Sequence, residues 1–122
     1  MIPPRVRYVR LYTEQDGQAR FQDLEFTLAP TEFSPPAPPV NVSDQLGASA
    51  FMVLRSPAGW TDAEHPAPAR QFMIMLEGLL EVSAGGETRQ FSPGNMLLVE
   101  DTTGPGHGST VLEDVAMAVV RL

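Results

Sequence analysis

Apolar and polar residues alternate over short stretches of this 122-residue chain, and no stretch sustains the apolar spacing of a long amphipathic helix. Twelve prolines and ten glycines divide the chain into short pieces. Short alternating segments separated by turn residues are typical of β-sandwiches and β-barrels. The pattern therefore predicts an all-β fold with no internal repeat.

The first predicted unit is a β-hairpin. Its strands run from Val6 to Thr13 and from Ala19 to Leu28, and the turn between them ends in Asp16-Gly17. Asp-Gly is a strong hairpin signal because both residues tolerate positive φ. Apolar and polar residues alternate in the second strand, so one side is expected to face water. We expect the hairpin to lie on a barrel or to be exchanged between two barrels.

A proline-rich segment follows, from Pro30 to Pro39. Such segments can serve as ligands for aromatic grooves. We favour a stiff strap over the barrel surface, anchored by Phe33 and Val40. Residues 41–49 are ambiguous and allow one helical turn. Residues 1–49 are thus predicted to form a hairpin and a strap packed on a barrel of residues 50–122, all within one domain.

Residues 50–122 have the pattern of the barrel itself. Turn chemistry occurs at Ala84-Gly85-Gly86-Glu87 and at Ser92-Pro93-Gly94-Asn95. One segment, Phe72–Leu76, is apolar throughout and predicts a strand buried on both faces. The predicted strands are Ala50–Arg55, Arg70–Leu76, Leu79–Ala84, Glu87–Phe91, Met96–Glu100, Gly108–Leu112 and Val115–Leu122.

Composition narrows the range of partners. The net charge of −7 opposes a phosphate backbone and anionic lipid, so we expect no nucleic acid and no membrane as partner. The absence of cysteine excludes disulfides, thiolate metal sites and a cysteine nucleophile, and it fits a cytoplasmic protein. The first ten residues lack the apolar centre of a signal peptide, and no apolar run is long enough to span a bilayer.

The chain contains only two histidines, and each lies in a motif that resembles the cupin superfamily. In the first cupin motif, Gly59, His65 and Gly78 match in spacing. Ala67 stands at the second histidine position, and Gln71 stands at the glutamate position.

The second cupin motif is also partly preserved. Pro93-Gly94-Asn95 opens it, and Gly104 and His107 close it, over a loop about two residues longer than is usual. Thr102 replaces the usual closing proline, and Val111 stands where some cupins have asparagine. The resemblance covers residues 50–122 and is closest to small bacterial single-domain cupins.

The resemblance implies a double-stranded β-helix, the jelly-roll cupin barrel, with the N-terminal hairpin as an accessory. Cupins commonly pair through one sheet, which implies a homodimer. The superfamily includes dioxygenases, isomerases, epimerases, decarboxylases, lyases and sugar-binding transcription factors, so the fold alone does not select a reaction. No helix-turn-helix segment accompanies the barrel, which argues against a transcription factor.

One interpretation of the site is a metal centre. In metal-binding cupins three histidines and a glutamate converge on Fe, Mn, Ni, Cu or Zn. Of these ligands the chain keeps His65 and His107, with Gln71 as a weak neutral donor, so a divalent metal (Fe, Ni, Zn or Mn) would be weakly held or absent. Glu64, Glu100 and Asp101 lie nearby in sequence but not at ligand positions of the family.

The other interpretation is acid–base chemistry without a metal. Imidazole titrates near neutral pH, so one of the two histidines can accept a proton while the other donates one. Gln71 would then orient a carbonyl or hydroxyl group of the substrate. Two histidines that only make structural hydrogen bonds remain the alternative to both interpretations.

Strand alternation predicts what lines the lumen. Met73 and Met75 share a face with Gln71, and Ser109 and Val111 follow His107 inward. Met52, Met96 and Met117 are further candidates for the lining of the lumen, on a less direct argument. Trp60 is expected near the mouth of the barrel, where it could stack on a ligand. Methionines at these positions suit an apolar or aromatic ligand, or simply fill the core.

These observations lead to one favoured function and two alternatives. The favoured function is a small enzyme of isomerase, cyclase or lyase type that binds an apolar or aromatic small molecule and uses His65, His107 and Gln71 for proton transfer. The alternatives are a ligand-binding or sensor cupin without turnover, and a metal-dependent oxygenase with an incomplete ligand set. A homodimer is expected in each case.

Overall fold

The computed structural model describes residues 5–122, and within that range the chain forms ten β-strands and no helix. None of the described residues therefore forms a helix that could cross a membrane. The all-β prediction is confirmed. The strands are β1 (Arg5–Thr13), β2 (Ala19–Thr27), β3 (Ala29–Thr31), β4 (Val40–Val42), β5 (Ala50–Ser56), β6 (Thr61–His65), β7 (Gln71–Ala84), β8 (Glu87–Phe91), β9 (Met96–Val99) and β10 (His107–Arg121).

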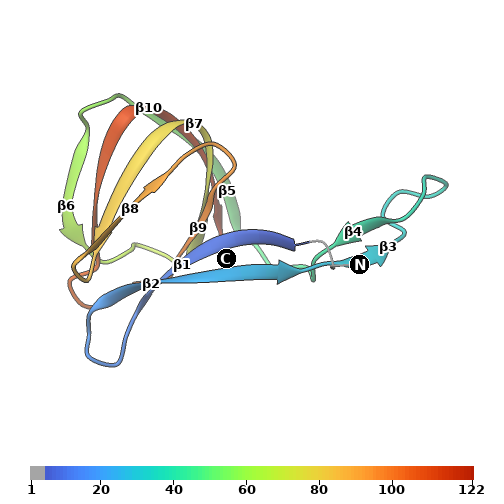
Figure 1. Ribbon diagram of the computed structural model, residues 1–122, viewed down its shortest axis with the longest axis horizontal. Helices are drawn as coiled ribbons and strands as arrows, with labels where there is room; N and C mark the ends of the chain where they lie inside the picture. Colours follow the sequence, from blue (N-terminus) through green and yellow to red (C-terminus); the bar gives the residue numbers. More distant parts are fainter. Residues whose placement is uncertain (1–4) are drawn as a thin grey trace.

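Eight of these strands form one sheet that curls into a barrel (Figure 1). Its main order is β2-β1-β9-β7-β10-β5, with β8 paired to β7 and β6 paired to β10. The two long strands link the halves of the barrel. The first half of β7 pairs with β9 and the second half with β8, while the first half of β10 pairs with β6 and the second half with β5.

The predicted N-terminal hairpin is present and is part of the barrel sheet. Strands β1 and β2 are antiparallel over their whole length, from the Arg5–Thr27 pair to the Thr13–Ala19 pair. Strand β1 also pairs in parallel with β9. Leu11 of β1 is completely buried, so the hairpin contributes to the barrel core.

The proline-rich segment extends away from the barrel instead of crossing it as a strap (Figure 1). Strands β3 and β4 pair only with each other, and every residue from 29 to 41 is exposed. Proline has no N–H to donate to a ladder, so this segment cannot join the barrel sheet along its length. No helical turn forms in residues 41–49. We call residues 29–42 the arm.

Three details of the barrel differ from the predicted strands. Strand β7 is continuous through Gly78, whose φ of +83° bends the strand without ending it. Strand β10 is likewise continuous, although its register with β7 shifts between Val111 and Met117. Strand β6 was not predicted, because its sequence Thr61–His65 is almost entirely polar.

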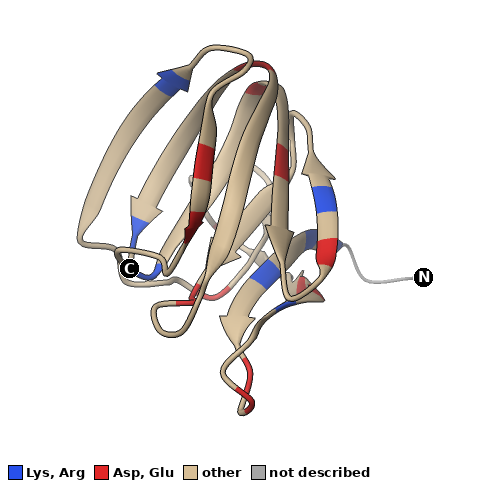
Figure 2. Ribbon diagram, turned by 90° about the vertical axis from the view of Figure 1, so that its left-hand side faces the viewer, with Lys and Arg blue, Asp and Glu red and all other residues tan. Residues whose placement is uncertain are grey.

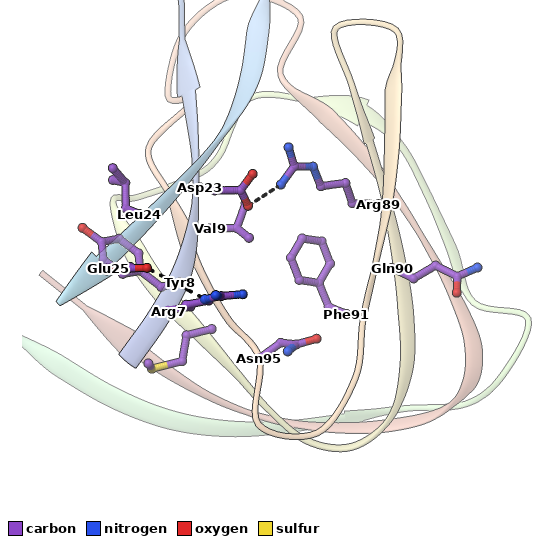
Figure 3. A pocket seen from close by; sticks show the side chains of 11 residues that line it. Arg7, Tyr8, Val9, Asp23, Leu24, Glu25, Arg89, Gln90, Phe91 and Asn95 are labelled. Carbon is purple, nitrogen blue, oxygen red and sulfur yellow. Dashed lines mark hydrogen bonds and ion pairs between the residues drawn. The ribbon is translucent and has the colours of Figure 1, made fainter. Parts of the chain in front are cut away.

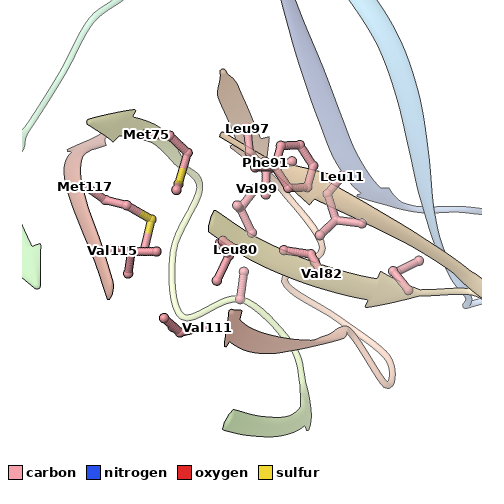
Figure 4. Packing of buried hydrophobic residues seen from close by; sticks show 13 residues of the cluster. Leu11, Met75, Leu80, Val82, Phe91, Leu97, Val99, Val111, Val115 and Met117 are labelled. Carbon is pink, nitrogen blue, oxygen red and sulfur yellow. The ribbon is translucent and has the colours of Figure 1, made fainter. Parts of the chain in front are cut away.

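The hydrophobic core lies inside the barrel, where side chains from both halves of the sheet pack together (Figure 4). Its buried side chains come from seven segments of the chain, and several are completely buried. Burial of each such aliphatic side chain stabilises the fold by about 1.5–3 kcal/mol. The central members are Leu11, Met75, Leu80, Val82, Phe91, Leu97, Val99, Val111, Val115 and Met117.

Charged residues are scattered over the strands and turns without a contiguous patch of one sign on the face that Figure 2 shows. Most form pairs, such as Arg55 of β5 with Glu77 of β7, whose side chains meet at 2.8 Å across the intervening strand β10.

Candidate functional site

The barrel lumen holds a cavity of about 360 Å³. This volume lies within the range of small-molecule sites, near its lower end. The walls are mainly apolar, with side chains such as Leu54, Met73 and Met117. The polar side chains that line it include His65, Gln71, His107, Asp62 and Ser109.

The two histidines come from neighbouring strands that meet at the cavity. His65 ends β6, His107 begins β10, and the two residues are register partners. Their ring centroids are 5.2 Å apart. Gly106 permits this approach, because its φ is +74° and a Cβ there would overlap the backbone carbonyl of His65. The glycine before His107 therefore allows the two strands, and with them the two rings, to lie close together.

His107 is paired with a buried carboxylate. Its Nδ1 lies 2.6 Å from Oδ2 of Asp101, and both side chains are almost fully enclosed. Because a carboxylate only accepts, Nδ1 carries the proton. The Nε2 atom has no hydrogen-bond partner within residues 5–122, and the ring lines the cavity. His107 therefore presents a lone pair to whatever occupies the lumen.

His65 has two acceptors and so differs from His107. Its Nδ1 donates to the carbonyl of Pro66 at 2.8 Å, and its Nε2 donates to Oδ2 of Asp62 at 2.5 Å. Both bonds form together only when both ring nitrogens are protonated. The bond to Pro66 raises the pKa of His65, and Asp62 raises it further, against a partial burial that lowers it. The geometry and the pKa both favour the imidazolium form.

Gln71 is oriented by an arginine. Its Oε1 accepts a hydrogen bond from Nε of Arg121 at 3.1 Å. Arginine can only donate, so the oxygen must face Arg121, and the amide NH₂ remains available to the cavity that Gln71 lines. An NH₂ group in this position can donate to a carbonyl or hydroxyl oxygen of a ligand.

The structure separates the predicted lining residues into two groups. His65, His107, Gln71, Trp60, Met73 and Ser109 line the cavity, as do Met117 and Val111. Met75, Met52 and Met96 do not. Met75 packs into the core cluster beyond the cavity, and Met52 lies on the edge strand β5 with more than a third of its surface exposed. Met96 points to the opposite face of β9 from the lining residue Leu97.

Two functional residues were not assigned from the sequence. Asp62 lies three residues before His65, on a strand that was not predicted, so no strand pattern indicated its position. Asp101 is six residues from His107 and was considered only as a possible metal ligand. Its completely buried side chain and its bond to Nδ1 make it the residue that orients His107. Of the other acids near the histidines, Glu64 is exposed, and Glu100 accepts hydrogen bonds from Arg10 and Arg70.

The donor set does not fit a metal centre of the cupin type. Both nitrogens of His65 are engaged, Ala67 has no donor atom, and the oxygen of Gln71 already accepts from a cationic arginine. Among residues 5–122 no group of three or more histidine, cysteine, aspartate or glutamate side chains is arranged to hold a metal ion.

A second cavity, of about 740 Å³, lies between the hairpin and β8 (Figure 3). Its charged side chains are paired with one another: Arg89 contacts Asp23 at 2.8 Å, and Arg7 contacts Glu25 at 3.9 Å. It contains no histidine. The lumen, with two differently held imidazoles, is therefore the stronger candidate site.

Comparisons with solved structures identify the fold. One similar structure is that of a conserved protein of unknown function from Streptococcus pyogenes. The alignment covers 65% of this chain and 68% of the other protein's chain, with 21% sequence identity and a TM-score of 0.51. A cupin superfamily protein from Desulfitobacterium hafniense matches 66% of this chain and 72% of its own, with 14% identity and a TM-score of 0.52. The chain has the cupin fold.

The predicted fold, a jelly-roll barrel like that of cupins, is thereby confirmed. No protein-family model matches the sequence, and no curated protein is significantly similar to it. At such low identities the likeness of this chain to the two structures concerns the fold alone. Its function has to be argued from the lumen.

Proposed function

We propose that this cupin is a small enzyme that binds an apolar or aromatic compound in the barrel lumen and catalyses proton transfer on it, in a reaction of isomerase, cyclase or lyase type. The proposal rests on one observation: two imidazole rings 5.2 Å apart line one cavity, and they differ in their hydrogen bonds, since both nitrogens of His65 are bonded while Nε2 of His107 has no partner among residues 5–122. A group with a free lone pair beside a group that can donate a proton is an arrangement suited to acid–base catalysis.

His107 is the proposed general base. Asp101 holds the proton on Nδ1, which leaves the Nε2 lone pair free to remove a proton from the substrate. The carboxylate also stabilises the imidazolium that His107 becomes. The carbon next to a carbonyl group is a suitable source of this proton, since the resulting negative charge moves to the carbonyl oxygen.

His65 is the proposed acid. As an imidazolium it can stabilise the negative charge that develops on the substrate and then return a proton at a different position. The NH₂ group of Gln71 can donate to the same substrate oxygen. Apolar walls such as Leu54 and Met73 would hold the body of the substrate and exclude water.

Binding without turnover is the second candidate, and one observation favours it. Both nitrogens of His65 are already bonded to Asp62 and to Pro66. A ligand must displace Asp62 before His65 can exchange a proton with it. If the ligand leaves the bond between Asp62 and His65 in place, the cavity only binds the ligand and the protein acts as a sensor or carrier of it without turnover.

Hydrogen exchange at carbon tests the proposal even while the net reaction is unidentified. Small aromatic and aliphatic carbonyl compounds that raise the melting temperature would be incubated with the protein in D₂O, and mass spectrometry would measure deuterium at carbon. We expect exchange with wild type and a loss of roughly 10²–10⁴-fold in H107Q, with ligand binding retained. Exchange should persist after chelator treatment.

Two results would oppose the proposal. Compounds that occupy the lumen of the wild-type protein but show neither exchange nor turnover would establish the binding function instead. Exchange that survives H107Q would show that His107 is not the base. Occupancy of the lumen is checked with S109W, which narrows the cavity and should weaken binding of the same compounds.

A further inference from the structure

Arg121 differs from every other arginine in the part of the chain that the structure describes. All eight basic residues of the sequence are arginines. Seven of them form ion pairs with aspartate or glutamate side chains. Arg121 forms none within residues 5–122, although it is only partly exposed. Because partial burial makes an unpaired charge costly, an anion beside Arg121 would be bound more strongly than on an open surface.

Strand pairing places Arg121 beside the lumen. Arg121 of β10 is the register partner of Gln71 of β7, and its Nε donates to Oε1 of Gln71 at 3.1 Å. Register partners present their side chains on the same face of a sheet, and Gln71 lines the lumen cavity. On β5 the partner of Arg121 is Ala50, whose methyl group offers no acceptor. The guanidinium therefore lies next to the cavity wall, at the end of β10.

Arg121 and Gln71 together present donors that lack acceptors. The bond to Gln71 uses only Nε of the guanidinium, and neither Nη atom has a hydrogen-bond partner within residues 5–122. The NH₂ group of Gln71 has none there either, although this side chain is only 8% exposed. Neither group can accept a hydrogen bond in this orientation. The ligand that satisfies both is one that only accepts, and an anion also balances the charge of Arg121.

We propose that the substrate is a small apolar carboxylic acid, bound as its anion, with the carboxylate held by Arg121 and by the NH₂ group of Gln71. This inference rests on the proposed function and narrows its substrate class. A planar guanidinium presents parallel N–H donors that match the two oxygens of a carboxylate. The cavity of about 360 Å³, with mainly apolar walls, takes the rest of the molecule. Gln71 has two N–H groups, so one can serve the carboxylate while the other serves the carbonyl oxygen of the substrate.

Isothermal titration calorimetry on the full chain tests this proposal with matched acids and amides. The pairs are phenylacetate and phenylacetamide, hydrocinnamate and its amide, and hexanoate and hexanamide, whose members differ mainly in charge. Wild type should bind the acid at least about tenfold more tightly than the amide. R121Q should abolish this difference. R55Q is the matched control, because it removes an arginine whose charge Glu77 already balances, and it should keep the difference.

Q71A separates direct contact from positioning. The guanidinium remains in Q71A, so a preference for the acid should persist, although weakened. Loss of the preference in Q71A as complete as in R121Q would show that Arg121 acts only by orienting Gln71, and would overturn its assignment as the anion-binding group. Equal affinity of wild type for acid and amide, or no binding of any of the acids, would overturn the proposal as a whole. Tighter binding of phenylphosphonate than of phenylacetate would overturn the choice of a carboxylate.

Hydrogen exchange in D₂O keeps this inference separate from the catalytic proposal. Levulinate carries a carboxylate and also C–H groups next to a ketone, and its amide lacks the charge. A preference for the acids without exchange into levulinate would support this inference and oppose catalysis. Exchange into levulinate and its amide at equal rates, lost in H107Q, would support catalysis and overturn the role of Arg121.

Discussion

The two histidines of the lumen have the same side chain but different neighbours, and the neighbours decide their chemistry. His107 has one acceptor, Asp101, and keeps a free Nε2. His65 has two acceptors and is therefore held as an imidazolium. The positions of both histidines could be predicted from the sequence, but this difference could not, because it depends on the unpredicted strand β6, which carries Asp62, and on the loop after β9, which brings Asp101 to His107.

The Asp101–His107 bond predicts the tautomer of His107. In wild type the neutral ring should carry its proton on Nδ1. In D101N the amide NH₂ can donate to Nδ1, so the proton should move to Nε2 and remove the free lone pair. Side-chain ¹⁵N NMR distinguishes the two tautomers directly. D62N is the control, since the Asp62 carboxylate bonds to His65 and not to His107. A His107 spectrum unchanged by D101N would contradict the assigned role of Asp101.

Strands β7 and β10 give the barrel its shape because each belongs to both halves of it. The pattern of apolar residues located their buried segments but predicted two strands in place of each one. The reason is that a bend in a strand interrupts the apolar alternation as a loop does. At the bend of β7, Gly78 has a positive φ, and its Cα lies against the backbone of Glu113 and Asp114 in β10.

This close approach predicts that G78A destabilises the barrel strongly. The new Cβ would overlap the carbonyl oxygens of Glu113 and Asp114, in addition to the cost of a positive φ for alanine. G86A is the matched control, with a φ of +81° and no atom near the new Cβ. Chemical denaturation should give a loss of about 1–2 kcal/mol for G86A and at least about 3 kcal/mol for G78A. Equal losses would show that β7 and β10 do not require this contact.

In the molecule as a whole, one carboxylate connects the N-terminal hairpin to the barrel. Glu100, at the end of β9, accepts hydrogen bonds from Arg10 of β1 and from Arg70, which precedes β7. Burial raises the pKa of Glu100, but the hydrogen bonds from the two arginines outweigh it and lower the pKa. The hairpin was predicted as an accessory to the barrel, and this cluster and Leu11 instead integrate it into the sheet.

Glu100 and His65 together predict how stability depends on pH. The folded pKa of Glu100 is lowered, so its contribution is complete above the unfolded pKa of 4.5 and is lost as pH falls through the folded value. The folded pKa of His65 is raised, so its contribution is complete below the unfolded pKa of 6.5 and is lost as pH rises through the folded value. Both contributions are therefore complete only between the unfolded pKa of Glu100, 4.5, and the unfolded pKa of His65, 6.5, and their combined stabilisation of the fold is greatest in that pH range.

Two variants separate these contributions when free energies of unfolding are measured at one fixed protein concentration. The difference between wild type and E100Q should be about 1 kcal/mol near neutral pH, since both arginines are partly exposed, and should vanish at about pH 3. The difference between wild type and H65N should be larger at about pH 6 than at about pH 8.5. If the H65N difference does not change with pH, the Pro66 and Asp62 contacts do not stabilise the imidazolium, and the acid role proposed for His65 loses its basis.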